Sequence, residues 1–236
     1  MSSAAGFPEP AAALPTLTGP QHAAVAKLAY AADQSASIAV LCGPAGVGKT
    51  TVLRHVAAIG MPTGRTILLG TQAELADPDQ AIGSGDTWSA AADPPDLLLV
   101  DDADRAAATD LCDLIERWRR RRADIVFVLA GQGRLLSLMA ADTRLERSVR
   151  LRVTLPTFTL SESSRLVAAV WPLQRPAAED EADGVIRTIH EIAGGVPAVA
   201  LRLAEMAAML EAADPGRGLV PEDIETIHRR LWLTAA

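Results

Sequence analysis

The stretch Gly43-Pro-Ala-Gly-Val-Gly-Lys-Thr50 matches the pattern G-x-x-x-x-G-K-[ST] at every fixed position. It follows the apolar run Ile38 to Cys42 and precedes the helical pattern Thr51 to Ala58. A strand, a glycine-rich turn and a helix in this order form a phosphate-binding loop, because the amides of the turn and the positive end of the helix dipole point at one anion. The sequence therefore predicts an α/β protein that binds a nucleotide.

Each residue type of this loop has an expected role toward ATP and Mg²⁺. The glycines allow the backbone to curl around the phosphates. Lys49 is expected to reach the β- and γ-phosphates, and Thr50 to place its hydroxyl on Mg²⁺. The alternative is a glycine-rich turn with a surface lysine, but the chain has only one other lysine, Lys27, and otherwise uses arginine. The expected nucleotide-binding residues are Gly43, Pro44, Ala45, Gly46, Val47, Gly48, Lys49, Thr50 and Thr51.

A second motif is Leu97-Leu-Leu-Val-Asp101-Asp102, four apolar residues followed by two carboxylates. The carboxyl end of a buried strand lies where α/β sheets bind ligands, so Asp101 is expected to hold Mg²⁺, directly or through water. Asp102 is the candidate to polarise the attacking water; its alternative role is to cap the following helix. Many proteins of this class carry glutamate there, and aspartate is one methylene shorter. A weak or partner-dependent hydrolase is therefore one expected outcome.

Apolar runs alternate with helical patterns up to Pro156, which predicts a parallel sheet with helices on both faces. Strands are expected at Ile38 to Cys42, Arg65 to Leu69, Leu97 to Val100, Asp124 to Ala130 and Val149 to Leu155. Helices are expected at Arg105 to Arg121 and Leu135 to Arg147. Residues 77–95 are expected to be loop, with Trp88 anchored against the core.

After Pro156 the pattern changes to helices without a strand signal. They are expected at Ser161 to Trp171, Glu181 to Ala193, Pro197 to Ala212 and Pro221 to Leu233. The first residues are rich in alanine and proline and lack apolar periodicity, which favours disorder. The predicted division is a disordered tail (1–16), a nucleotide-binding domain (17–157) and a small helical lid domain (158–236).

The composition narrows the class of protein. A hydrophobic fraction of 49% and a charged fraction of 22% are typical of a soluble globular protein. The net charge of −7 gives no nucleic-acid footprint over the whole surface. Cys42 and Cys112 are far apart in apolar surroundings, which indicates buried thiols in a reducing compartment. Without a long apolar run or a basic leader, the chain is expected to be cytoplasmic and not inserted in a membrane.

Several later motifs carry a family resemblance. The run Ile125-Val-Phe-Val-Leu-Ala-Gly-Gln132, the triplet Leu145-Glu-Arg147, the pair Leu155-Pro156 and the turn Ala193-Gly-Gly-Val-Pro197 stand in the order found in AAA+ ATPases. From about residue 17 to 233 the chain resembles the AAA+ ATPases of the ExeA/GspA secretion type, with the MuB/TniB transposition ATPases as relatives. The resemblance implies a P-loop sheet of strand order 5-1-4-3-2 and a helical lid over the nucleotide.

The resemblance also implies two further catalytic residues. Gln132, after the fourth strand, matches the sensor position near the γ-phosphate; alternatively it is a polar loop residue. Arg147 matches the arginine that reaches the nucleotide of the neighbouring subunit. Its close rivals are Arg144, Arg150 and Arg152, and a plain surface salt bridge is the alternative role.

One departure from the family pattern concerns the lid. An arginine that senses the nucleotide usually follows the Gly-Gly-Val-Pro turn, but Ala198 stands there. Arg202 lies one helical turn further on, where it can face the same way. Without that arginine, the coupling between the lid and the bound nucleotide is in question. A motor stroke driven by hydrolysis is then in question as well.

The sequence is best interpreted as an AAA+ ATPase that binds Mg·ATP and hydrolyses it to ADP and phosphate to drive assembly or remodelling of a partner complex. A homo-oligomer and a protein partner are expected. ATP is favoured over GTP because the chain has no asparagine for a guanine-reading Asn-Lys-x-Asp motif. The alternatives are an ATP-dependent switch or scaffold with little turnover, and a DNA-associated regulator. For the latter, Arg117 and Arg119 to Arg122 would contact phosphates, although such runs are usually solvated helix ends.

Overall fold

The computed structural model describes residues 14–60, 64–84, 86–87, 94–171, 179–214 and 218–233. Most of the predicted tail (1–13) and the predicted anchor Trp88 lie outside these ranges. The chain forms two compact units. The first contains Met1–Leu41 and Lys49–Val153, and the second contains Cys42–Gly48 and Thr154–Ala236. The predicted domain boundary at residue 157 stays a prediction.

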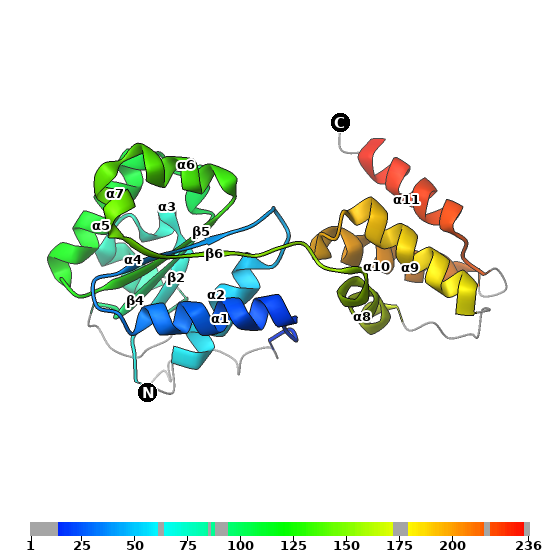
Figure 1. Cartoon of the computed structure of the whole chain (residues 1–236), viewed down its shortest axis with the longest axis horizontal. Coiled ribbons are helices and arrows are strands. Elements are labelled where there is room, and N and C mark those ends of the chain that lie inside the picture. Colours follow the sequence, from blue (N-terminus) through cyan, green and yellow to red (C-terminus); the bar gives the residue numbers. More distant parts are fainter. Residues whose placement is uncertain are drawn as a thin grey trace, which may run out of the picture. The chain divides into compact units, whose positions relative to one another are not determined.

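The first unit is built on a six-stranded sheet of order β3-β2-β4-β5-β1-β6 (Figure 1). The strands are β1 (Ile38–Cys42), β2 (Ile67–Thr71), β3 (Asp86–Thr87), β4 (Leu97–Asp101), β5 (Val126–Gly131) and β6 (Val149–Thr154). Without β3 they form the predicted parallel sheet of order 5-1-4-3-2, so the fold class is confirmed. The two-residue strand β3 pairs antiparallel with β2 and was not predicted.

The strands β1, β4 and β5 in the middle of the sheet are almost wholly apolar, as expected for strands that helices cover on both faces. Every residue of β1 and β5 is buried. The helices α1 (Gly19–Ala32) and α2 (Lys49–Gly60) lie on one face, and α6 (Gly133–Ala141) and α7 (Thr143–Ser148) lie on the other (Figure 1). The pairing of β2 with β4 runs from Ile67 opposite Leu97 to Thr71 opposite Asp101. This register puts Thr71 and Asp101 together at the carboxyl edge of the sheet.

Two helix predictions and one loop prediction are corrected by the structure. The helix predicted at 105–121 begins only at Ala108 (α5, Ala108–Arg121), because a short 3₁₀ helix, η2 (Ala103–Arg105), comes first. The helix predicted at 135–147 is interrupted at Asp142, whose carboxylate accepts the N–H groups of Arg144 and Leu145 and so begins α7. The predicted loop 77–95 contains the helix α4 (Pro78–Ser84), and α3 (Gln72–Leu75) precedes it.

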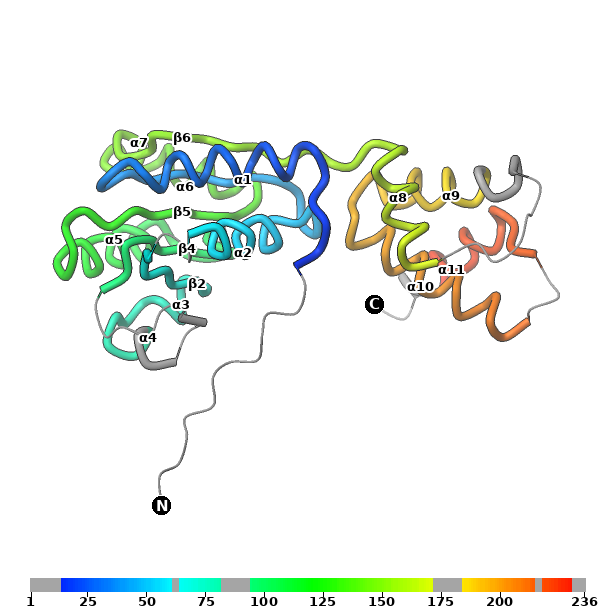
Figure 2. The backbone as a smooth tube through the Cα atoms, turned by 90° about the horizontal axis from the view of Figure 1, so that it is seen from below, coloured from blue at the N-terminus to red at the C-terminus, as the bar shows by residue number. Residues whose placement is uncertain are grey.

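The described residues of the second unit form four helices, as expected for the C-terminal region (Figure 2). They are α8 (Leu160–Val170), α9 (Glu179–Ala193), α10 (Pro197–Ala213) and α11 (Pro221–Leu233). Their apolar faces meet in one core, to which Val167, Ile189, Leu203 and Ile224 contribute fully or almost fully buried side chains. In the part of the chain that the structure describes, no helix has the length and apolar character needed to cross a membrane.

Candidate functional site

The start of α2 and the end of β4 bring the two predicted magnesium-binding residues together. The hydroxyl of Thr50 donates a hydrogen bond to Oδ2 of Asp101 over 2.5 Å. Lys49, the first residue of α2, is only 8% exposed. A hydroxyl beside a carboxylate is a set of oxygen donors of the kind that Mg²⁺ prefers. These two residues therefore fit the metal that the sequence predicts.

The loop Gly43 to Gly48 has a backbone that requires glycine. Gly46 and Gly48 have φ angles of +75° and +101°, which residues with a Cβ rarely adopt. A Cβ on Gly43 would lie 2.9 Å from a methyl group of Val47 and 3.0 Å from the carbonyl of Leu155. Val47 is buried, whereas Pro44, Ala45 and Gly46 are exposed. The buried Val47 side chain thus anchors the loop, whereas its tip, residues 44–46, is exposed.

The tip of this loop (residues 44–46) contacts the first turn of α10 through Gly46. The N–H of Ala198 donates to the carbonyl of Gly46 over 3.2 Å. A Cβ on Gly46 would lie 2.8 Å from the Ala198 methyl group and 3.1 Å from a methyl group of Val196. The first N–H groups of a helix have no intrahelical acceptor, so the loop carbonyl satisfies one of them. Ala198 therefore contacts the loop through its backbone, at the position where the resemblance implies an arginine. The exposed Arg202 lies further along α10.

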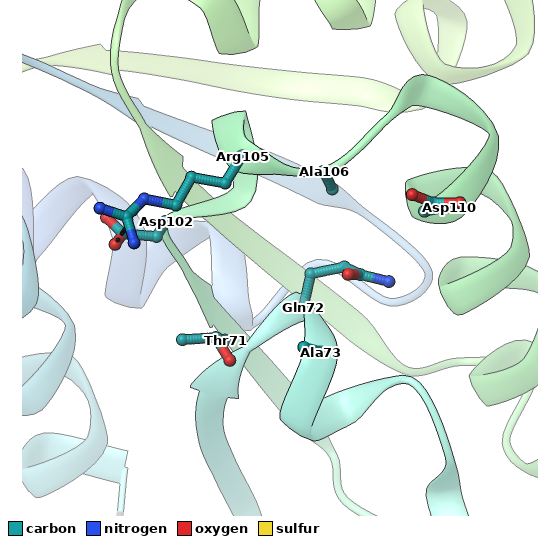
Figure 3. Close-up of a pocket in the computed structure, with 7 residues that line it drawn as sticks. All are labelled: Thr71, Gln72, Ala73, Asp102, Arg105, Ala106 and Asp110. Carbon is teal, nitrogen blue, oxygen red and sulfur yellow. Dashed lines mark ion pairs between the residues drawn. The ribbon is translucent and has the colours of Figure 1, made fainter.

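The carboxylates of Asp101 and Asp102 have different partners. It adopts a left-handed conformation (φ 47°, ψ 33°), and its N–H donates to Oδ1 of Asp101 over 2.9 Å. Its carboxylate lies 3.4 Å from Nε of Arg105 and makes no capping hydrogen bond to the 3₁₀ helix. The pair lines a cavity of about 330 Å³ (Figure 3). The other residues of this cavity are Thr71, Gln72, Ala73, Ala106 and Asp110.

Gln132, the predicted sensor residue, directly follows β5 and is exposed. It is the N-cap residue of α6, but its side chain does not make the capping hydrogen bond. Within the described ranges its side chain has no recorded hydrogen bond. Its amide is therefore available to a ligand at the end of β5, and its role stays a prediction.

The four candidate arginines around α7 differ in their partners. Arg144 pairs with Asp142 over 3.2 Å and with Glu116 over 3.4 Å. The side-chain hydrogen bond from Arg144, with its backbone N–H, lowers the pKa of Asp142 to about 2. The remaining three, Arg147, Arg150 and Arg152, are exposed, and among the described residues none of their side chains has a recorded hydrogen bond or ion pair. Of the four candidates, Arg144 thus differs from the other three in that its side chain has ion-pair partners among the described residues.

The arginine side chains of the basic run at the end of α5 contact acceptors within the first unit. Arg122 pairs with Asp96 over 2.5 Å and with Asp124 over 3.1 Å. The other contacts are those of Arg117 with the Ala76 carbonyl, Arg119 with the Ala36 carbonyl and the Phe127 ring, Arg120 with the Glu116 carbonyl, and Arg121 with Asp79. Because the partners of Arg117, Arg119 and Arg121 lie about 40 to 80 residues away in the chain, the sequence alone did not reveal these contacts.

The sheet order and the phosphate-loop motif define the fold of a P-loop nucleoside triphosphatase, with the strand order of AAA+ folds. The chain belongs to the novel STAND NTPase 5 family, whose profile matches residues 21–144. The finer resemblance to the ExeA/GspA secretion ATPases stays a prediction. No curated protein matches the chain in sequence.

Solved structures of low sequence identity share the fold. The Holliday junction branch migration motor RuvB of Thermotoga maritima matches with a TM-score of 0.56 and 17% identity, over 87% of this chain and 65% of that chain. The ADP form of the Aeropyrum pernix ORC2 protein matches with a TM-score of 0.58 and 14% identity, over 88% and 67%. For C. elegans PCH-2 the values are 0.55, 16%, 92% and 70%. The chain thus spans about 65% of the length of RuvB.

Proposed function

We propose that this chain binds Mg·ATP with Gly43 to Thr50 and hydrolyses it to drive assembly or remodelling of a partner complex. The observation that carries the proposal is the contact of the Thr50 hydroxyl with the Asp101 carboxylate, because it joins the two motifs that need a common metal. The positive φ angles of Gly46 and Gly48 support it, since they curl the loop so that amides can face one anion.

In this proposal each side of the nucleotide has its own residues. The amides of residues 43–48 and of Thr51, with the positive end of α2, hold the phosphates. Lys49 contacts the β- and γ-phosphates, and Thr50 and Asp101 hold Mg²⁺. The metal, when bound, neutralises charge that develops on the phosphate oxygens. ATP is the proposed nucleotide, as the absence of asparagine favours it over GTP.

Hydrolysis needs residues that act on the water and on the γ-phosphate. A carboxylate oxygen of Asp102 accepts a proton from the attacking water, and Gln132 contacts the γ-phosphate at the end of β5. Arg147 acts from a neighbouring copy, which makes a homo-oligomer part of the proposal. Its exposure and the absence of a recorded partner within the described ranges support this role. The proposed setting is the cytoplasm, with a protein partner.

Phosphate release from ATP tests the proposal. Asp102→Asn keeps the size of the side chain but removes the proton acceptor, so turnover should fall about 10²-fold while ATP binding is retained. Removal of Mg²⁺ by chelation should stop turnover in the unchanged chain. Equal turnover by the unchanged chain and Asp102→Asn would contradict the assigned role of Asp102.

The second candidate is an ATP-dependent switch or scaffold with little turnover. Two observations favour it: Asp102 is paired with Arg105, and Ala198 replaces the lid arginine. ATP binding without phosphate release, measured with and without candidate partners, would select this function. The DNA-associated alternative stays a prediction, and the arginines of α5 that it would use have partners inside the unit.

A further inference from the structure

The successive residues Asp101 and Asp102 at the end of β4 have carboxylates with different neighbours. Asp101 accepts the Thr50 hydroxyl from the start of α2. Asp102 instead lines the cavity of Figure 3, whose residues all come from 71–73 and 102–110. In this view the charged ends of Asp102 and Arg105 meet at one end of the cavity, and Asp110 lies at the other. The residue assigned to activate water therefore faces a cavity to which neither Lys49 nor Thr50 contributes.

The backbone between these residues produces the ion pair. Asp102 is in the left-handed region, which aspartate tolerates better than most residues with a Cβ. Its carbonyl accepts the N–H of Arg105 over 3.0 Å, which closes a tight turn. That turn places Nε of Arg105 3.4 Å from the Asp102 carboxylate. The pairing therefore follows from the conformation of Asp102 itself.

We propose that Arg105 is a positioning residue that holds the Asp102 carboxylate on the cavity side of β4, and that ATP hydrolysis requires this ion pair to open. The inference rests on the proposed function and concerns only its hydrolytic step. Arg105 slows turnover for as long as the pair is closed, until the nucleotide, or a partner, draws Asp102 away from it.

The exposure of the pair sets the size of the restraint. The side chains of Arg105 and Asp102 are 81% and 44% exposed, and only one nitrogen approaches one oxygen. Such exposed pairs contribute up to about 1 kcal/mol, and since 1.36 kcal/mol is tenfold in rate, the restraint slows turnover by up to about fivefold. Salt screens a pair of this kind. The cavity of about 330 Å³ beside the pair leaves space for either side chain to move.

The experiment is a comparison of kcat and KM for phosphate release. Arg105→Ala should raise kcat about two- to fivefold and leave KM for ATP unchanged. Arg105→Lys keeps a cation at this position, so its kcat should lie nearer that of the unchanged chain. The matched control is Arg120→Ala, which removes an exposed arginine whose recorded bond is a long one to the Glu116 carbonyl, and it should change neither constant.

Salt and a double variant separate restraint from a general structural effect. At saturating ATP, added 0.5 M salt (about 3 to 5 Å of screening length) should raise kcat of the unchanged chain toward that of Arg105→Ala and leave Arg105→Ala itself unchanged. In the background of Asp102→Asn, Arg105→Ala should have no effect, because the group that it releases is missing.

The outcomes distinguish this inference from the proposed function. If Lys49→Ala abolishes ATP binding but Arg105→Ala gives no rise in kcat over Arg120→Ala, the restraint is wrong and the nucleotide site stands. A decrease of kcat in Arg105→Ala, or no turnover in either chain, also overturns the restraint. If Lys49→Ala binds ATP as the unchanged chain does, the proposed function fails and the inference with it.

Discussion

Two arginine-rich parts of the first unit use their charges in opposite ways. The α5 arginines (Arg117 and Arg119 to Arg122) are dense in sequence, and their guanidinium groups contact carbonyls, carboxylates and an aromatic ring of the same unit. The edge arginines (Arg147, Arg150 and Arg152) are sparse, exposed and without a recorded partner among the described residues. Density of charge in a sequence therefore does not locate a binding surface. What matters is whether the groups already have internal partners.

The largest effect is expected at the edge arginines. Arg147→Ala should lower kcat for ATP on the order of 10³-fold, because an arginine acting on the neighbouring nucleotide stabilises charge in the transition state. ATP affinity and the unfolding midpoint should stay unchanged, since the Arg147 side chain has no recorded hydrogen bond or ion pair in the described part of the chain. Phosphate release and urea unfolding measure the two quantities.

Arg150→Ala and Arg152→Ala are the matched controls for that change. Both remove an exposed arginine of β6, and both should leave kcat within a few fold of the unchanged chain. A loss of turnover at Arg150 or Arg152, with normal turnover in Arg147→Ala, would assign the trans-acting role to another edge arginine.

The next effect is expected in the α5 arginines and concerns stability instead of turnover. Arg122 lies between Asp96 and Asp124 and also donates to the Pro94 carbonyl over 3.1 Å. Arg122→Ala should lower the free energy of unfolding by about 1–2 kcal/mol and leave ATP binding unchanged. Arg120→Ala, with its single long bond, should cost less than about 0.5 kcal/mol. If Arg122→Ala weakened ATP or DNA binding at unchanged stability, the contrast between the two groups would fail.

The smallest effect is expected at Asp142, which pairs with the one α7 arginine that has internal partners. Because hydrogen bonds from Arg144 lower the pKa of Asp142 to about 2, below its value of about 3.9 in an unfolded chain, the contribution to stability is full above about pH 4. It is lost as the pH falls toward 2. Asp142→Asn should therefore destabilise the chain slightly at pH 6, and the difference should shrink in acid.

Urea unfolding at several pH values measures this difference. Asp113→Asn is the matched control, because the Asp113 carboxylate is exposed on α5 and has no recorded hydrogen bond within the described ranges. A difference between the unchanged chain and Asp142→Asn that stays constant from pH 6 to pH 2.5 would contradict the assigned pairing.

Sequence reasoning worked where a local pattern determines the structure. The central strands follow from apolar runs that can be buried on both faces, β6 follows from an alternating pattern, and the phosphate loop follows from its glycines and their spacing. It failed where one residue fits two local structures. Asp142 lies inside the single helix predicted from Leu135 to Arg147, but its carboxylate begins a new helix. Pro78 was read as a breaker, although proline also suits the first turn of a helix such as α4.

The candidate site shows the same limit. The meeting of Thr50 with Asp101 could be predicted, because the two motifs have known places at the edge of a parallel sheet. The pairing of Asp102 with Arg105 depends on a left-handed turn that no residue pattern in the sequence predicts. The contact of Gly46 with Ala198 joins residues that are far apart in the chain, so only the folded structure reveals it.

Equilibrium binding of Mg·ATP to three chains tests the central claim most directly. We expect the unchanged chain and Lys27→Ala to bind with equal affinity in isothermal titration calorimetry, because Lys27 is an exposed lysine of α1. Lys49→Ala should bind at least about 10²-fold more weakly, since the ammonium group that contacts the β- and γ-phosphates is removed. Equal affinity of all three chains would contradict the claim that the loop Gly43 to Thr50 holds the triphosphate.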